Sequence, residues 1–161
     1  MRRLVQWRGH AWLALPARLY LAWVFIYACI HKIAHPGSFA LDIATYDILP
    51  LELINPLAIT LPWVELGAGV LLVLGWRSRG AALAIVGMMV MFMVAIAMAL
   101  DAGLDMSCGC FASQAMEDDP IGGWTLVRDS AWLLLGLYVF VFDRRPLGLD
   151  GWLAKRRRND A

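Results

Sequence analysis

The chain has 161 residues, of which 61% are hydrophobic and only 17% are charged, and its formal net charge is +1. Its mean hydropathy of +0.64 is far above that of a soluble domain of this length. This composition indicates a single membrane domain over residues 1–161 and leaves little chain for a separate soluble domain. The sequence contains no phosphate-binding glycine loop and no nucleic-acid-binding motif, so we expect no nucleic-acid partner.

Four stretches are long enough to cross the bilayer, which requires about 20 apolar residues. They cover about 16–35, 56–75, 80–100 and 124–142. We therefore expect an all-α integral membrane four-helix bundle. Pro16 and the Asn55-Pro56 pair are typical of helix starts, and we place the first two helices there. Pro62 predicts a kink inside the second helix.

Basic residues predict the orientation of the bundle. Eleven of the fourteen Lys and Arg lie before the first helix, between the second and third, or in the tail 143–161. The other two connections contain Lys32 alone, so the positive-inside rule places both termini in the cytoplasm. In a bacterium this is the inner membrane, and the connection over 101–123 then faces the periplasm, where disulfides persist.

That outer connection contains two of the three cysteines, Cys108 and Cys110, separated by Gly109. Their spacing permits a disulfide, but so small a ring is strained and easily reduced. A bridge over so short a loop also removes little chain entropy, which disfavours a purely structural role. We interpret the pair as catalytic thiols for disulfide exchange, and a structural disulfide or a metal site remain alternatives.

Cys29, His31 and His35 follow one another near the outer end of the first helix. With the cysteine pair they would form a copper or zinc site in a metal-handling protein. The simpler interpretation is a buried cysteine acting as a small hydrophobe, with histidines at the wet interface. We therefore assign no metal ligand.

Glu65 is the most unusual residue of the second helix. At about nine residues from the expected start it would lie roughly 13 Å deep, where a carboxylate must face the bundle or be paired. We expect Arg128 to be its partner and Arg18 to extend to the inner surface. The Glu65–Arg128 pair would bind a quinone head group or relay protons, or it would only lock two helices together.

Two further features belong to the outer side. Asp129 either points to the outer rim and bonds to the cysteine loop, or is a solvated first-turn carboxylate. Ser38 is expected to cap a short helix that lies on the membrane surface or covers the bundle. That helix would carry the apolar residues Phe39, Ile43 and Tyr46 on one side, with Asp42 close by.

The segments "RLYLAWVFIYACIHKIAHPGSFA", "LPWVELGAGVLLVLGWRSRGAA", "CGCF" and "LVRDSAWLLLG" together resemble the methylamine utilization protein MauE and the wider DoxX group of redox-associated membrane proteins. The resemblance covers about 16–142. It implies a four-helix membrane bundle and a role in making or maintaining periplasmic methylamine dehydrogenase. The site residues that it carries over are Cys108, Cys110, Glu65, Arg128 and Asp129.

The resulting hypothesis is a protein that supports periplasmic thiol–disulfide chemistry, as a quinone-linked oxidoreductase or as an accessory subunit. Its partners would be a periplasmic thiol or disulfide protein, other oxidoreductase subunits and membrane quinone, which is the one candidate cofactor. The alternatives are a non-catalytic scaffold subunit of an oxidoreductase complex and the metal-handling protein described above.

Overall fold

A computed structural model of the chain describes residues 9–103, 123–143, 148–152 and 156. The main helices of this part are α2 (Gly9–Ala34), α3 (Pro36–Thr45), α4 (Leu51–Leu74), α5 (Ser78–Asp101) and α6 (Gly123–Phe142). Except for α3, each is long and apolar enough to cross a membrane. The predicted all-helical membrane architecture is therefore confirmed for the described residues. Cys108, Cys110 and most of the basic tail lie outside them.

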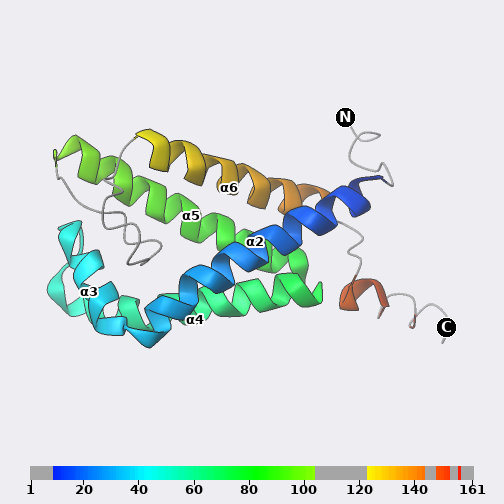
Figure 1. Ribbon diagram of the computed structural model, residues 1–161, viewed down its shortest axis with the longest axis horizontal. Helices are drawn as coiled ribbons and strands as arrows, with labels where there is room; N and C mark the ends of the chain where they lie inside the picture. Colours follow the sequence, from blue (N-terminus) through cyan, green and yellow to red (C-terminus); the bar gives the residue numbers. More distant parts are fainter. Residues whose placement is uncertain (1–8, 104–122, 144–147, 153–155, 157–161) are drawn as a thin grey trace.

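The four long helices form a bundle in which α2 packs along α4 and α5 packs along α6. Further contacts between α2 and α6 and between α4 and α5 close the bundle (Figure 1). The start of α2 and the end of α6 lie at one end of the bundle, and α3 lies at the other end against α4. The connection between α5 and α6 starts and finishes at the α3 end.

Two helices begin earlier than the sequence predicts. α2 starts at Gly9 and contains Pro16, and α4 starts at Leu51 after Pro50 and contains Pro56 and Pro62. The expected starts at Pro16 and Asn55-Pro56 were therefore wrong. In hydrocarbon an unpaired backbone group is costly, so a helix that continues through a proline loses less than one that ends there.

The core fills the half of the bundle that is distant from α3. Large buried side chains there include Leu21 on α2, Leu72 on α4 and Ile85 on α5. Glycines allow the helices to approach closely at this level. A Cβ atom on Gly69 would lie 2.7 Å from Ile26 Cγ1.

Arg18 and Asp143 form a buried ion pair at the end of the core. Arg18 is 1% exposed, and its Nη1 donates to Asp143 Oδ2 at 3.3 Å. The expectation that Arg18 extends to the inner surface was wrong, because Arg18 is buried and bonds to Asp143. Asp143 directly follows α6 and lies 125 residues away in the sequence. Gly75 follows α4 with φ of 62° and lies against the guanidinium.

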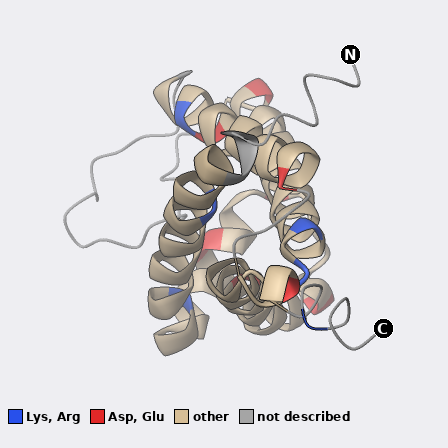
Figure 2. Cartoon of the chain, turned by 90° about the vertical axis from the view of Figure 1, so that its right-hand side faces the viewer, with Lys and Arg blue, Asp and Glu red and all other residues tan. Residues whose placement is uncertain are grey.

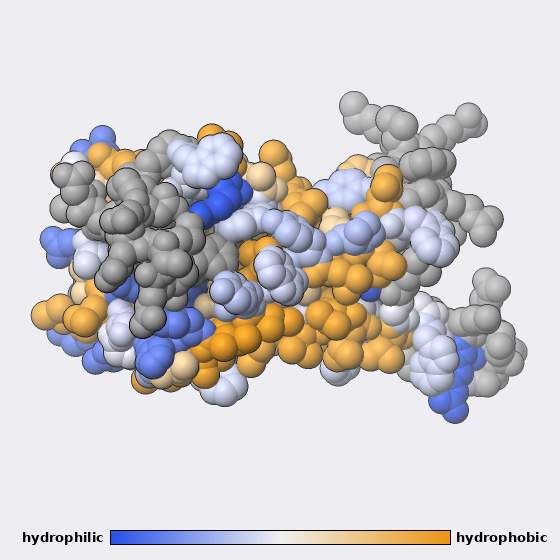
Figure 3. Space-filling model, viewed as in Figure 1, coloured by the Kyte–Doolittle hydropathy of each residue, from blue (hydrophilic) through white to orange (hydrophobic). Residues whose placement is uncertain are grey.

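The surface fits a membrane location. Viewed from the end where α2 begins, charged positions are sparse on the helices (Figure 2). In Figure 3 hydrophobic surface covers the middle of the molecule, and hydrophilic residues gather at the α3 end. A paler strip crosses the apolar surface. One face of α2 exposes the aromatic residues Tyr20, Trp23 and Tyr27. Lipid therefore contacts most of the outer faces of the helices.

The turn at Gly75 gives a test of the packing. Gly75→Ala should lower the free energy of unfolding by about 1–2 kcal/mol, because a Cβ is disfavoured at positive φ. That Cβ would also lie 3.0 Å from Arg18 Nη1 and from Gly148 Cα. Gly67→Ala is the matched control, since nothing lies within 4 Å of a Cβ there. Unfolding in mixed detergent micelles, followed by circular dichroism, would measure both, and equal effects would contradict the described turn.

Candidate functional site

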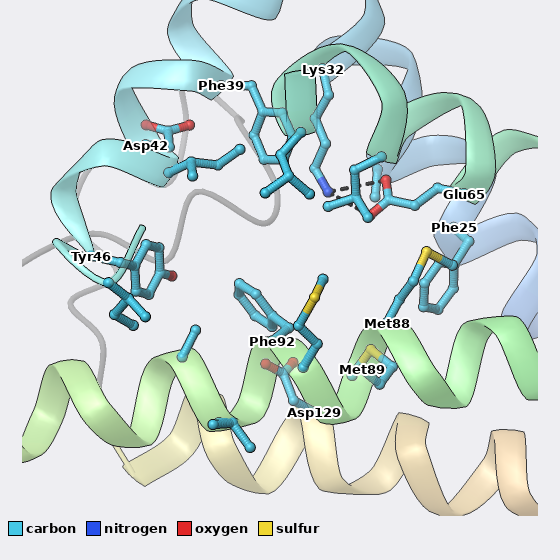
Figure 4. Close-up of a pocket in the computed structure, with 18 of the residues that line it drawn as sticks. Phe25, Lys32, Phe39, Asp42, Tyr46, Glu65, Met88, Met89, Phe92 and Asp129 are labelled. Carbon is cyan, nitrogen blue, oxygen red and sulfur yellow. Dashed lines mark hydrogen bonds and ion pairs between the residues drawn. The ribbon is translucent and has the colours of Figure 1, made fainter. Parts of the chain in front are cut away.

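A pocket of about 310 Å³ lies between the helices in the half of the bundle that α3 covers. Its walls come from α2, α3, α4, α5 and α6 and are mostly apolar, as Figure 4 shows. Its polar side chains are few: Lys32, Asp42, Tyr46, Glu65 and Asp129. A mainly apolar cavity with a few convergent polar groups is the usual form of a small-molecule site.

Lys32 and Glu65 form a buried ion pair at one wall of this pocket. Lys32 Nζ donates to both carboxylate oxygens of Glu65, at 3.0 and 3.1 Å, and both side chains are less than 10% exposed. The ammonium also lies 4.9 Å from the centre of the Phe39 ring. This arrangement joins α2, α3 and α4 at one point.

The predicted pairing of Glu65 with Arg128 was therefore wrong. It assumed that the second helix begins at Pro56, whereas α4 begins five residues earlier, at Leu51. That shift moves Glu65 relative to the other helices and brings it level with Lys32. The methylenes of Lys32 can lie along apolar surface while its charged end turns into the bundle. The mutual positions of two helices along their axes are not visible in a sequence.

Arg128 and Asp129 lie on α6, across the pocket from this pair. Arg128 Nε donates to Asp129 Oδ1 at 3.2 Å, and its guanidinium lies 5.1 Å from the Trp132 ring centre. Asp129 is 1% exposed, so its interpretation as a solvated carboxylate was wrong. Its second oxygen, Oδ2, has no hydrogen-bond partner among the described residues. The predicted bond to the cysteine loop lies outside them.

α3 closes the pocket, and the three apolar residues that were predicted to share one side of this segment all line it. Phe39, Ile43 and Tyr46 all line the pocket, and Tyr46 meets Phe92 of α5 edge-to-face at 6.3 Å. The expected cap at Ser38 was wrong. The helix instead begins after His35 with Pro36, whose fixed φ suits a first turn.

Burial affects the pKa values of two titratable side chains on the α3 side of the pocket, Tyr46 and Asp42. Burial, followed by the charges of Asp42 and Asp129, raises the pKa of Tyr46 to about 12. Burial also raises the pKa of Asp42, although His31 and Lys32 act in the opposite direction. Tyr46 is therefore a neutral phenol at physiological pH and remains a hydrogen-bond donor.

Cys29, His31 and His35 do not line the pocket. Cys29 is fully buried, and its Sγ donates to the carbonyl of Ile26 at 3.1 Å, which is the setting of a small core hydrophobe. The rings of His31 and His35 lie 4.8 Å apart. Within the part of the chain that the structure describes, no three His, Cys, Asp or Glu residues are grouped as metal ligands.

Sequence reasoning missed Lys32 and did not indicate that methionines of α5 line a pocket. Met88, Met89 and Met98 line the pocket, although methionine in a membrane helix usually only fills space. The available signal for Lys32 was its position as the lone basic residue of the two connections, with their edges, that were expected to face outward. A lysine near the end of a membrane helix can turn outward to water or inward to a carboxylate, and only packing decides which.

The buried pair predicts a large effect of neutralising one partner. Glu65→Gln should destabilise the protein by roughly 3–5 kcal/mol, because the Lys32 ammonium would stay buried without a counter-charge. The uncharged double variant Lys32→Met/Glu65→Leu should recover most of this loss. Glu52→Gln, at an exposed site on the same helix, is the control. Unfolding in mixed micelles measures all three, and a Glu65→Gln loss no larger than that of the control would show that the pair is not buried.

The phenol of Tyr46 predicts a pH dependence. An unfolded tyrosine titrates near pH 10, so the raised folded pKa of Tyr46 stabilises the fold below about pH 10. That contribution is lost as the pH rises to about 12. The difference in phenolate absorbance between the wild type and Tyr46→Phe should therefore have its midpoint near pH 12. A midpoint near 10 would mean that the phenol is in contact with water.

Comparison with known proteins identifies the family. Residues 10–142 match the family described as methylamine utilisation protein MauE. A curated methylamine utilization protein MauE of Methylorubrum extorquens is 34% identical over 122 residues, which are 75% of this chain and 64% of that protein. One of Methylophilus methylotrophus is 31% identical over 139 residues, which are 86% of this chain and 71% of that protein.

The matched region thus spans slightly less than two thirds of the first of these relatives. No solved structure matches the chain. The family match covers most of the chain and all four long helices. The chain therefore belongs to the MauE family of methylamine utilisation proteins.

Proposed function

We propose that this protein is a bacterial inner-membrane protein that exchanges disulfides with a periplasmic partner through Cys108 and Cys110. The observation that carries the proposal is the position of their segment in the chain. Residues 104–122 join α5 to α6 at the α3 end of the bundle, where the pocket lies.

Charge distribution supports the orientation that this function needs. Arg77 and Arg79 lie at the turn between α4 and α5, at the end opposite α3. The other basic clusters precede α2 or follow α6 and so belong to the same side. By the positive-inside rule that side is cytoplasmic, which assigns the α3 end and the cysteine segment to the periplasm.

The proposed exchange begins when a thiolate of the partner attacks the disulfide between Cys108 and Cys110 and forms a mixed disulfide. The second partner thiol then resolves it. The partner loses two electrons and two protons as its disulfide forms, and Cys108 and Cys110 become thiols. Their reoxidation passes two electrons and two protons to a membrane quinone, which becomes quinol.

The family name supports a partner in methylamine utilisation. Both curated relatives are named methylamine utilization proteins. We propose periplasmic methylamine dehydrogenase, or a related periplasmic enzyme, as the protein whose disulfides are made or maintained. A non-catalytic scaffold role is the second candidate. The exposed aromatic face of α2 favours it, because such a face offers area for another membrane subunit.

The redox state of the pair in living cells tests the proposal. With a membrane-impermeant alkylating reagent, Cys108 and Cys110 should be found oxidised during respiration. They should become reduced when respiration is blocked, because quinol then accumulates and no oxidant remains. A pair that stays oxidised under both conditions would be a structural disulfide and would favour the scaffold.

Substitution provides the second test. Cys108→Ser/Cys110→Ser should abolish formation of disulfide-bonded methylamine dehydrogenase and growth on methylamine. Cys29→Ala is the matched control, because Cys29 is buried away from the pocket and should leave both unchanged. Normal growth of the double variant, at normal levels of protein in the membrane, would contradict a catalytic role for the pair.

A further inference from the structure

The pocket is larger than packing defects usually are. Protein interiors contain few voids larger than a water molecule, whereas this cavity of about 310 Å³ reaches the size of small-molecule sites. It also contains a buried polar atom without a partner among the described residues, Asp129 Oδ2. Such an atom costs free energy unless something bonds to it. The cavity therefore has the features of a site that a ligand completes.

The rim of the pocket shows how a ligand enters. Met91, Val94 and Met98 line the pocket and are also 50%, 53% and 50% exposed. They lie three and four residues apart, on one face of α5. Because α5 is a membrane-spanning helix, this rim faces hydrocarbon rather than water. A ligand that enters here is soluble in lipid, and an apolar tail can remain in the bilayer.

The charges in the pocket select the head group. An anionic head would meet the carboxylates of Asp42, Glu65 and Asp129. A cationic head would have to compete with the existing cationic partners of two of these carboxylates, because Glu65 is paired with Lys32 and Asp129 with Arg128. A neutral polar head avoids both costs. Lys32 has three donor hydrogens and Glu65 accepts two of these bonds, so a third remains for a carbonyl oxygen.

The aromatic side chains select a flat head group. Rings are contributed to the walls by Phe39 of α3, by Tyr46 directly after α3, by Phe92 of α5 and by Trp132 of α6. In Figure 4 the Tyr46 and Phe92 rings lie next to each other, Asp129 lies below Phe92, and Lys32 lies on the opposite wall. Ring walls of this kind stack well against a planar ring. The donor Lys32 and the acceptor Asp129 thus lie on different sides of a cavity that suits one planar ring.

We propose that this pocket binds the ring of a lipid-soluble quinone, with Lys32 donating to a carbonyl oxygen and Asp129 Oδ2 accepting from a hydroxyl of the quinol. The isoprenoid tail leaves between the α5 rim residues into the bilayer. This inference rests on the proposed function, which requires a quinone, and assigns that quinone a site. The site consists only of residues on α2 to α6 and does not include the cysteines.

The first experiment measures binding of decylubiquinone to the purified full chain by quenching of tryptophan fluorescence. Binding should be saturable, and Ala95→Phe should weaken it at least tenfold because the added ring fills the pocket, which Ala95 lines. Ala97→Phe is the matched control: it makes the same change on the same helix, at an exposed position outside the pocket, and should leave binding unchanged. Equal effects of the two variants, or no saturable binding, would overturn the proposal. The proposal would also be overturned if oleate displaced decylubiquinone, bound more tightly than it and lost this binding in Ala95→Phe. The pocket would then be an acyl-chain site.

The second experiment tests Asp129 by comparing decylubiquinone with decylubiquinol. Asp129→Asn should weaken quinol binding about tenfold relative to quinone binding, because the amide replaces a charged acceptor of the quinol hydroxyl. Thermal unfolding of the variant shows whether it is folded, and the ratio of the two affinities compares both ligands on the same folded protein. An unchanged ratio would contradict the role of Asp129.

The outcomes separate this inference from the proposed function. Cys108→Ser/Cys110→Ser should bind decylubiquinone as the wild type does. If that variant binds quinone and also supports growth on methylamine, the thiol function fails and the quinone site stands. If the cysteines change redox state with respiration but Ala95→Phe leaves binding unchanged, the pocket assignment fails and the thiol function stands.

Discussion

Charged side chains inside a membrane protein must be paired, because desolvation of a lone ion is far more costly than any packing contact can offset. Two buried ion pairs follow from this constraint, and both start from α2. Lys32 bonds to Glu65 of α4 at the level of the pocket, and Arg18 bonds to Asp143 at the end of α6. Together they fix α2 to two different neighbours at two different depths.

Between these two levels lies the main hydrophobic core, and the pocket lies beside the Lys32–Glu65 pair on the α3 side. Glycine at positions such as Gly69 and Gly136 allows close approach in the core. On the α3 side the side chains are larger and α3 is tilted over α4, so the pocket remains between the helices. The Lys32–Glu65 pair therefore joins α2 to α4 and also forms part of a wall of the cavity.

The site combines groups that differ in how they are held. Lys32 and Glu65 bond to each other, whereas Asp129, which lines the cavity, has one oxygen bonded to Arg128 and the other without a partner among the described residues. A buried polar group with no partner is costly, and natural proteins usually retain one only where a ligand or another group bonds to it. For a member of the MauE family, the pocket is thus a candidate small-molecule site at the end of the bundle where α5 ends and α6 begins.

The sequence by itself determined the all-helical membrane class, the four spans and the family, because hydrophobic length and local motifs are properties of single segments. It also indicated Glu65 as a buried carboxylate and one apolar side of α3, since both follow from neighbours along the chain. Only the tertiary structure decided that Glu65 meets Lys32, that Arg18 meets Asp143, and that Asp129 faces a cavity. These outcomes depend on how far each helix is shifted along its neighbours and rotated about its own axis, and those quantities are set by packing between segments distant in sequence.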